Sequence, residues 1–554
     1  MSRQLQAARR RAVVLASLAL AGCAAPAATP SPPSTVVTAT VVETTTVRVS
    51  DTTVALGTVD SAAPMAPAFD PPRPAREFRG AWVSPVWGSG MKDWPSRVGM
   101  TADEQRRELR TLLDHARDLG LNAIMLHVRT HGDALYPSAH APWSVYLSGS
   151  SGVPPSPSYD PLAFAIEEAH ARGLQLHAWF NPFRAAIAGL ADSPAPTHVR
   201  RAHPEWIKRY GTQTWIDPGF PEARRAVLDA VREVVRRYDV DGVHIDDYFY
   251  PYRERAPIPI RKGGRRAPAG DLPFPDEDTW RRYGAPRGFT DRAAWRRANV
   301  DELVQALYRE VKQEKPWVLV GISPFGVWRP GYPAGLTGLD AYGEIYADSR
   351  KWLLQGWLDY VAPQLYWELA GEQARFRRLD AWWRTQNPHD RHIWPGLHTA
   401  RVVGESSRWS LAEIPRQVEW LRAQREGSAE SNGHVHFRLA SIRSGPGGLF
   451  DPLRRVYASP ALVPASPWLG ASPPPRPARA QVSRGVVLVT PGDTTPVRWW
   501  LLRGRDASGR WSMELHPGAD RAIRTALAEP GRYPTLTVAA VGRTELESPP
   551  VAAR

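Results

Sequence analysis

Two adjacent carboxylates, Asp246 and Asp247, follow an apolar segment in the sequence VDGVHIDDYFYP, residues 240–251. Carboxyl groups this close repel each other when both are ionised, so their pKa values separate and one keeps its proton near neutral pH. A protonated and an ionised carboxyl group can divide the work of general acid and general base, or one of them can act as a nucleophile. The pair is therefore the first candidate for catalysis.

The same segment has the residue pattern of a barrel strand. Val243 and Ile245 alternate with His244, Asp246 and Tyr248, and a period of two places these sets on opposite faces of a strand. A face of His, Asp and Tyr is out of place in an ordinary sandwich core. It fits a barrel strand whose outer face packs on helices and whose inner face opens into a polar site.

Seven further strand candidates accompany this one, and helical patterns separate most of them. Thr101 and Glu104 form a capping-box pattern at the start of the first helix, and Gly120 ends it. Strands are expected at residues 78–87, 121–129, 174–181, 240–251, 317–324, 358–367, 392–398 and 433–441. Helices are expected at residues 101–120, 161–173, 221–238, 291–314, 347–356 and 411–426. This alternation predicts an α/β fold, a (β/α)8 TIM barrel over residues 76–463.

In such a barrel, chemistry takes place at the C-terminal ends of the strands. The two-residue period assigns an inward face to each strand, on which polar and aromatic side chains converge: His127 and Arg129, then His177, Trp179 and Asn181, then Gln364, Tyr366 and Glu368, and finally Trp394 and His398. Ile124, Val243, Ile245, Leu365 and Leu397 are expected to face the helices. The inward set therefore forms one candidate site around Asp246.

The two ends of the chain have different compositions from the barrel. Residues 1–22 combine a basic start, a short apolar run and the sequence LAGC, which closes at Cys23. This pattern resembles a bacterial lipoprotein signal, with cleavage before Cys23 and lipidation of its thiol. Residues 23–75 are rich in Ala, Pro, Ser and Thr and predict a tether. The expected location is the bacterial cell envelope, lipid-anchored at the outer membrane or the cell surface.

A Pro-rich linker at residues 464–477 follows the barrel. Beyond it, turn signals separate four short strand candidates that begin at Gly485, Val497, Gly509 and Tyr533. This spacing predicts a small fibronectin-like β-sandwich over residues 478–554. The sandwich either supports the barrel or binds glycan.

Composition excludes several other classes of function. The net charge of +14 comes mainly from Arg residues scattered along the predicted helices, without a zinc-finger, RNP or basic-zipper pattern, so nucleic acid is not an expected partner. No G-x-S-x-G motif is present, and no dinucleotide-binding Gly-rich loop follows a strand, so no cofactor is expected. The 23 Trp residues suit either core packing or stacking on sugar rings.

Seven motifs in order resemble the glycosyl-hydrolase-like family 10, formerly domain of unknown function 187, over about residues 76–460. They are FRGAWV from Phe78, DWPS from Asp93, AWFNP from Ala178, DPGFPE from Asp217, DGVHIDDYFYP from Asp241, YADSRKW from Tyr346 and VAPQLYW from Val361. The resemblance implies a barrel glycoside hydrolase of the bacterial envelope. It also implies a peptidoglycan substrate, in particular glycan strands stripped of their peptides. Family members often lack a carboxylate at the position of Glu368.

Glycoside hydrolysis needs one carboxyl group as acid and a second as nucleophile or base. Asp246 is the first choice for nucleophile or base. Asp247 is its candidate partner, although it can instead cap the following loop, and Glu368 is the alternative acid. The residues expected to contact substrate are His127, Arg129, Trp179, Asn181, His244, Tyr248, Gln364, Tyr366 and Trp367, because they offer directional hydrogen bonds or flat apolar faces.

Two alternatives remain open at the level of sequence. A lipid-anchored glycan-binding protein without activity would use the same barrel, although it has no need of two adjacent carboxylates. A metal-dependent hydrolase or deacetylase would bring His127, His177, His244 and Asp246 together as ligands. The first strand lacks the H-x-H pattern of barrel amidohydrolases, so no metal is expected.

Overall fold

The computed structural model describes residues 71, 75–86, 93–187, 193–255, 270–403, 409–425, 432–442, 444–445, 447–470 and 472–554. All of them belong to one compact unit, Ala68–Arg554. The expected signal segment, Cys23 and nearly all of the expected tether lie outside the described residues. None of the helices in the described part of the chain is both long and apolar enough to cross a bilayer.

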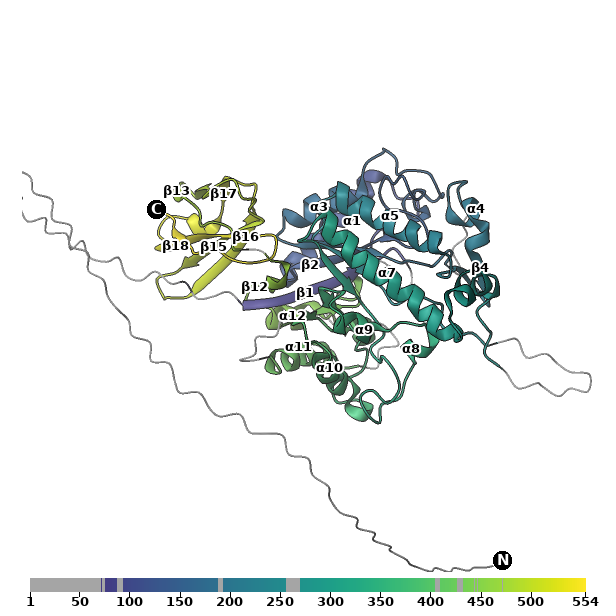
Figure 1. Cartoon of the computed structure of the whole chain (residues 1–554). Coiled ribbons are helices and arrows are strands. Elements are labelled where there is room, and N and C mark those ends of the chain that lie inside the picture. Colours follow the sequence, from purple (N-terminus) through teal and green to yellow (C-terminus); the bar gives the residue numbers. More distant parts are fainter. Residues whose placement is uncertain are drawn as a thin grey trace, which may run out of the picture. The chain divides into compact units, whose positions relative to one another are not determined.

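Parallel strands form a closed barrel in the centre of this unit (Figure 1). In chain order they are β1 (Ala75–Val83), β2 (Ala123–Arg129), β3 (Gln175–Phe180), β6 (Gly242–Ile245), β7 (Leu319–Ile322), β8 (Tyr360–Val361), β9 (His392–Ile393), β10 (Gly396–Leu397) and β11 (Asn432–His436). Each pairs with the next except β9 and β10, which are two halves of one strand that Pro395 interrupts; β8 pairs with β9, and β10 pairs with β11. Because β11 pairs with β1, the ring closes and the predicted eight-stranded barrel is confirmed.

One main helix follows each barrel strand. These helices are α1 (Ala102–Leu119), α3 (Pro161–His170), α5 (Pro221–Arg237), α7 (Arg292–Glu314), α9 (Ser349–Leu354), α10 (Arg375–Thr385), α11 (Glu413–Ala423) and α12 (Phe450–Val456). In the view of Figure 1, α1, α5 and α7 lie on one side of β1 and β2, and α10, α11 and α12 lie on the other. Shorter helices within the connecting loops are α2 (Val145–Ser148), α4 (Val199–Ala202), α6 (Glu277–Thr279) and α8 (Ala341–Glu344).

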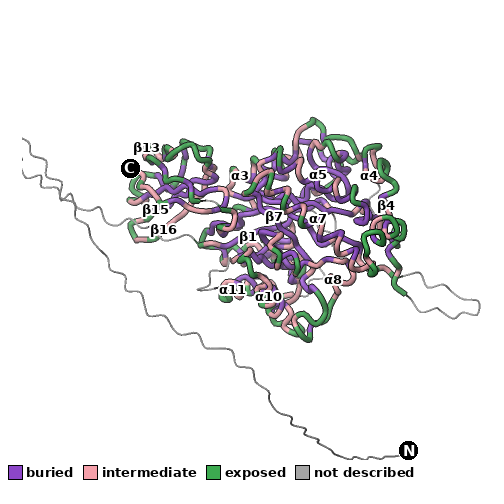
Figure 2. Tube along the Cα trace, viewed as in Figure 1, coloured by how far each residue is buried: buried purple, intermediate pink, exposed green. Residues whose placement is uncertain are grey.

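Local sequence signals set the ends of the long helices. Thr101 and Glu104 form the expected capping box at α1, and Gly120 ends that helix in the left-handed conformation. At α3 and α7, Asp160 and Asp291 accept hydrogen bonds from backbone amides of the first turn. The inner faces of the helices are buried against the strands (Figure 2).

Large aromatic side chains fill the barrel interior, and glycines on neighbouring strands make room for them. The rings of Phe78 and Trp394 stack with centroids 3.8 Å apart. A Cβ atom at Gly321 would lie 2.0 Å from the Tyr360 ring, and one at Gly242 would lie 2.4 Å from His177 Nδ1. Packing therefore explains why the DGVHIDD motif has a glycine at position 242, because the neighbouring His177 ring leaves room only for a hydrogen atom there.

Two insertions extend the upper, C-terminal end of the barrel. The first follows β3 and contains the antiparallel hairpin of β4 (Ile207–Tyr210) and β5 (Gln213–Ile216). The backbone at Arg184, just beyond β3, forms an antiparallel bridge with Trp215 of β5. The second insertion follows β6; its residues 256–269, with the basic run at 261–266, lie outside the described residues.

The C-terminal residues form two antiparallel sheets, as the sandwich prediction requires. One sheet has the order β13 (Arg479–Ser483), β14 (Val486–Thr490) and β17 (Ala522–Arg524); the other has the order β16 (Trp511–Pro517), β15 (Trp499–Arg505), β18 (Thr535–Val541) and β19 (Val551–Ala552). The sequence predicted only four of these strands: β17 and β19 have only three and two residues, and β13 was missed although it is as long as β14. The short β12 (Ala461–Leu462) pairs with the start of β1.

Candidate active site

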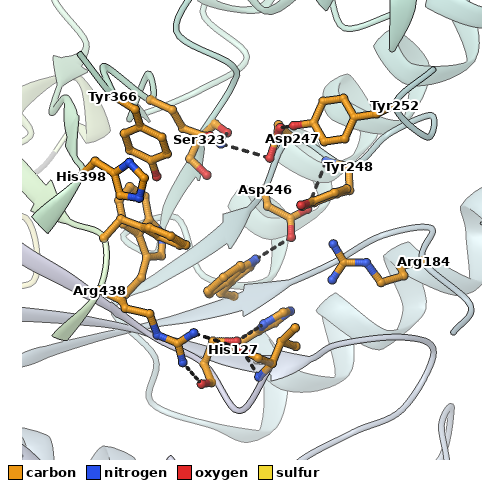
Figure 3. A pocket seen from close by; sticks show the side chains of 16 residues that line it. His127, Arg184, Asp246, Asp247, Tyr248, Tyr252, Ser323, Tyr366, His398 and Arg438 are labelled. Carbon is orange, nitrogen blue, oxygen red and sulfur yellow. Dashed lines mark hydrogen bonds between the residues drawn. The ribbon is translucent and has the colours of Figure 1, made fainter. Parts of the chain in front are cut away.

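A cavity of about 470 Å³ opens at the C-terminal ends of the barrel strands. We call it the main cavity. Its lining comprises Trp82, Ser84, Val86, His127, Trp179, Arg184, Asp246, Asp247, Tyr248, Tyr252, Ser323, Gln364, Tyr366, His398, Phe437 and Arg438. Figure 3 shows Asp246 and Asp247 between Arg184 on one side and Tyr366 with His398 on the other. Seven predicted site residues therefore meet in one place.

Both carboxylates reach the main cavity because the strand ends just before them. β6 stops at Ile245, so Asp247 is not bound to the outward face that strand alternation would give it. Asp246 continues the inward face of His244, and the turn brings Asp247 into the same lining. The sequence left the placement of Asp247 open; the structure places it beside Asp246.

Nitrogen donors surround Asp246. Trp179 Nε1 and Asn181 Nδ2 each donate to its Oδ2 at 3.0 Å. Its Oδ1 has longer contacts, 3.2 Å from Asn181 Nδ2 and 3.3 Å from the backbone N–H of Tyr248. Asp246 is 3% exposed, so these donors and the cavity, rather than bulk water, set its environment.

Asp247 has a different set of partners on the opposite wall. The Tyr252 hydroxyl donates to its Oδ2, and Gln364 Nε2 donates to its Oδ1 at 3.0 Å. Gln364 also donates to the backbone carbonyl of Ser323. The loop after β6, which carries Tyr252, and the segment after β8, which carries Gln364, thus hold the carboxyl group of Asp247 in place, and Gln364 is itself held by the segment after β7.

The environment favours protonation of both groups. The pKa of Asp246 is raised to about 7: burial is the main cause, the Arg184 guanidinium opposes it, and the neighbouring charge of Asp247 adds to it. Burial also raises the pKa of Asp247, against the hydrogen bonds from Tyr252 and Gln364. The pair can therefore hold a proton near neutral pH, which is what general acid catalysis requires.

Aromatic rings form the walls around the carboxylates. The rings of His127 and Trp179 stack with centroids 3.8 Å apart, and His127 Nδ1 lies 2.9 Å from Ser84 Oγ. Tyr366 packs against His398 and Phe437. A lining of flat apolar faces interrupted by a few directed polar groups suits a sugar ring.

Two predicted contact residues support the site from behind instead of lining it. Asn181 holds Asp246 through its amide nitrogen and accepts the backbone N–H of Arg184 at its oxygen. His244 lies below the cavity floor, where its ring contacts Trp82 Nε1, Ser323 Oγ and the Tyr360 hydroxyl, each at 3.0 Å. Both are completely buried.

Three other predicted residues lie away from the main cavity. A bulge in β2 pairs Arg129 with the outward-facing Phe180, so Arg129 does not share the inward face of His127 and the sequence assignment was wrong. Trp367 and Glu368 are half-buried and lie outside the lining of the main cavity. β8 ends at Val361, and by residue 367 the chain has left the barrel wall. The Trp367 ring packs against Phe325 instead.

Several lining residues were not selected from the sequence, namely Trp82, Ser84, Val86, Arg184, Tyr252, Ser323, His398, Phe437 and Arg438. His398 was placed on an inward face but given no role. Most of the others follow a strand end directly, so extension of each strand by a few residues would have found them. Arg438 is fixed through Asp93 of the DWPS motif, whose carboxylate it contacts at 2.5 Å.

The three histidines that the sequence offered as metal ligands each bind other protein groups instead of converging on one point. His177 contacts the Tyr360 hydroxyl and Gln175, while His127 and His244 have the partners given above. Within the described residues, no three His, Cys, Asp or Glu side chains gather in a metal-binding arrangement. The two histidines of the H-x-H in β11 both contact the Tyr457 hydroxyl.

Comparison with known proteins agrees with this geometry. The sequence matches the family described as Glycosyl hydrolase-like 10 over residues 77–410. It is 37% identical over 424 residues to Glycosyl hydrolase YngK of Bacillus subtilis (strain 168), which covers 74% of this chain and 77% of that protein. It is 35% identical over 395 residues to Glycosyl hydrolase DigH of Escherichia coli (strain K12), which covers 66% of this chain and 83% of that protein.

Among solved structures, the glycoside hydrolase domain of PgaB (BpsB) from Bordetella bronchiseptica matches with a TM-score of 0.44 and 15% identity, over 69% of this chain and 99% of that one. The family match and the two relatives decide the classification. The chain belongs to the glycosyl hydrolase-like 10 family, and it is a glycoside hydrolase that acts on a polysaccharide.

Proposed function

We propose that the enzyme hydrolyses the glycan strands of peptidoglycan, with a preference for strands that lack stem peptides. The observation that carries the proposal is the pair of buried carboxyl groups, Asp246 and Asp247, in a cavity walled by aromatic rings. A protein that only bound glycan would gain nothing from two carboxyl groups with raised pKa values, since each costs free energy to bury.

The contacts of the two groups suggest how they divide the work. Asp246 receives its shorter hydrogen bonds at Oδ2, so a proton on Oδ1 disturbs the fewest contacts. We assign Asp246 as the acid that protonates the leaving glycosidic oxygen. Asp247 then acts in its ionised form, as nucleophile or as base toward water. This assignment reverses the sequence-based first choice, in which Asp246 was the nucleophile or base.

The proposal extends to location. The LAGC pattern supports a lipid anchor at Cys23, which would hold the enzyme at the outer membrane or cell surface, next to its substrate. Substitution Cys23→Ser is expected to move the chain from the membrane fraction to the soluble fraction. Retention of the variant in the membrane fraction would contradict the anchor.

The experiment that tests the activity uses residues 68–554, incubated with intact peptidoglycan, peptide-free peptidoglycan strands and β-glucans. Mass spectrometry should detect short sugar products from the peptide-free strands first. Asp246→Asn should lower the rate by about 10² to 10⁴, the usual contribution of a general acid. Asp278→Asn is the matched control, because that carboxylate is exposed and pairs with Lys208. Cleavage of β-glucans alone, or full activity of Asp246→Asn, would overturn the proposal.

A further inference from the structure

A second cavity of about 540 Å³ adjoins the main one, and we call it the side cavity. The two cavities share Val86, Arg184, Tyr248 and Tyr252 in their linings. The rest of the lining of the side cavity comes from the β4–β5 hairpin together with Ala186, Ile187, Arg200 and Glu254. A glycan bound with one sugar at the carboxylates can therefore place a neighbouring sugar in the side cavity.

Arg184 lines both cavities, and Figure 3 shows it beside Asp246 in the main cavity. Its backbone forms a bridge with Trp215 of β5, and its N–H donates to Asn181 Oδ1 at 2.8 Å. Its guanidinium carbon lies 4.0 Å from the centre of the Tyr248 ring. A cation held against an aromatic face in this way loses little conformational entropy when it binds a ligand.

The positive charge of Arg184 lowers the pKa of Asp246 and Asp247 through space, without direct contact in an ion pair of the described residues. Among the residues that the structure describes, no carboxylate forms an ion pair with Arg184. Glu254 is the one carboxylate in the described lining of the side cavity. Its oxygens are occupied by the backbone N–H and hydroxyl of Thr212 and by Gln213 Nε2, so the hairpin takes up its charge.

We infer that Arg184 binds a carboxylate carried by the sugar next to the cleaved bond, and that the side cavity is a subsite for an acidic N-acetylated sugar. The inference rests on the proposed function, in which N-acetylmuramic acid is that sugar. A planar guanidinium with several N–H donors matches a carboxylate better than any neutral group, and the pairing strengthens in a cleft with little water.

This subsite gives a chemical reason for preference toward peptide-free strands. In intact peptidoglycan the lactyl carboxyl group of the muramyl residue is joined to the stem peptide as an amide, which is neutral and bulky. Removal of the peptide exposes a free carboxylate. Arg184 would therefore recognise the charge that appears only on the stripped strand.

A binding measurement tests the subsite without catalysis. Titration calorimetry of residues 68–554 should show N-acetylmuramic acid binding about ten- to a hundredfold more tightly than N-acetylglucosamine, the range expected for a charged hydrogen-bonded pair. Arg184→Gln should remove the difference and leave the affinity for N-acetylglucosamine unchanged. Arg184→Lys, which keeps the charge but not the planar fork, should fall between them. Equal affinities of the unmodified enzyme for the two sugars would overturn the inference.

A kinetic measurement separates recognition from an effect on the carboxylates. Peptide-free strands are compared with the same strands after coupling of their lactyl carboxyl groups to methylamine. The unmodified enzyme should lose about tenfold or more in kcat/KM on the amidated strands, and Arg184→Gln should not distinguish them. Arg253→Gln is the matched control, since Arg253 is exposed, pairs with Asp271 and lines neither cavity. If Arg184→Gln instead lowered kcat/KM by the same factor on both kinds of strand, the variant would still distinguish them. Arg184 would then act only on Asp246 and not on the substrate carboxylate.

If neither strand is cleaved by the unmodified enzyme, the proposed function fails. The binding comparison still decides the subsite in that case, because neither monosaccharide contains a bond to cleave.

Discussion

Asp246 and Asp247 are neighbours in sequence, yet their surroundings make them different groups. Trp179 and Asn181 direct N–H donors at one oxygen of Asp246, whereas a hydroxyl and an amide from two other segments hold Asp247. Burial dominates both pKa shifts, and the Arg184 guanidinium moderates the shift of Asp246. The ionisation of Asp246 should therefore govern activity across the neutral range.

The pH dependence of kcat/KM tests the assignment of Asp246 as the general acid. An acid must be protonated to act, so activity should fall as pH rises through about 7, where Asp246 loses its proton. Arg184→Gln removes a charge that lowers the pKa of Asp246, so the alkaline limb of its profile should move to higher pH. A profile that stays flat from pH 6 to 9, or a limb that moves to lower pH in the variant, would contradict the role of Asp246 as acid.

The sequence was most informative where side chains follow a regular strand. Asp246, Trp179 and His127 were placed correctly because the two-residue period holds up to those positions. Arg129 was misplaced by a bulge, and single-sequence periodicity gives no sign of one. Arg184 could not be found in this way, because its position depends on backbone pairing with Trp215, about thirty residues later in the chain.

At the scale of elements, the barrel depends on matching large and small residues between adjacent strands. Tyr360 of β8 projects across the space above Gly321 of β7. Its hydroxyl contacts both His177 Nδ1 and His244 Nδ1 at 3.0 Å, so this one side chain ties three strands together below the active site. The order of strands and helices could be predicted because caps and periodicity are local, but this interlocking could not.

Gly321→Ala should therefore disturb both stability and activity. The added Cβ atom would lie 2.0 to 2.2 Å from atoms of the Tyr360 ring, which is completely buried and has no room to withdraw. We expect a loss of about 1–3 kcal/mol in the free energy of unfolding, typical of an overpacked core, measured by urea denaturation. Activity should fall as well, since Tyr360 positions His244.

Gly270→Ala is the control for that substitution. A Cβ atom at Gly270 would meet no atom of the described residues within 4 Å, so the change should alter stability by less than about 0.5 kcal/mol. Equal effects of the two substitutions would show that the space above Tyr360 is not tightly filled.

At the scale of the whole molecule, charged contacts join the C-terminal sheets to the end of the barrel opposite the active site. Arg498 forms an ion pair with Asp241, which precedes β6, and the separation is 2.5 Å. Gln175, at the start of β3, donates to Glu545 at 2.8 Å. These contacts favour a supporting role for the sandwich over glycan binding, since they stand at the far ends of the strands that carry Asp246 and Trp179.

The Arg498–Asp241 pair should stabilise the protein in a pH-dependent way. Arg498 and His170 hold the pKa of Asp241 below its ordinary value, against the effect of burial. A depressed carboxyl pKa contributes stability that is present above the ordinary pKa of about 4 and is lost as pH falls through the folded-state value. Arg498→Met leaves a buried carboxylate that keeps its contacts with His170 and with the backbone N–H of Leu176 but has lost its guanidinium partner. The free energy of unfolding at pH 7 should therefore fall by roughly 3 kcal/mol.

The difference between Arg498→Met and the unmodified protein should shrink as the pH is lowered below about 4, because Asp241 is then protonated in the unfolded chain and in the variant, which has lost the charge that holds its pKa down. Arg543→Met provides the comparison, since Arg543 pairs with Asp239, whose side chain is 44% exposed. That variant should cost less than about 1 kcal/mol, as exposed ion pairs do. Urea denaturation followed by tryptophan fluorescence measures both variants. If they cost the same at pH 7, the buried pair does not anchor the sandwich, and the role of the C-terminal sheets must be sought in a contact outside the protein.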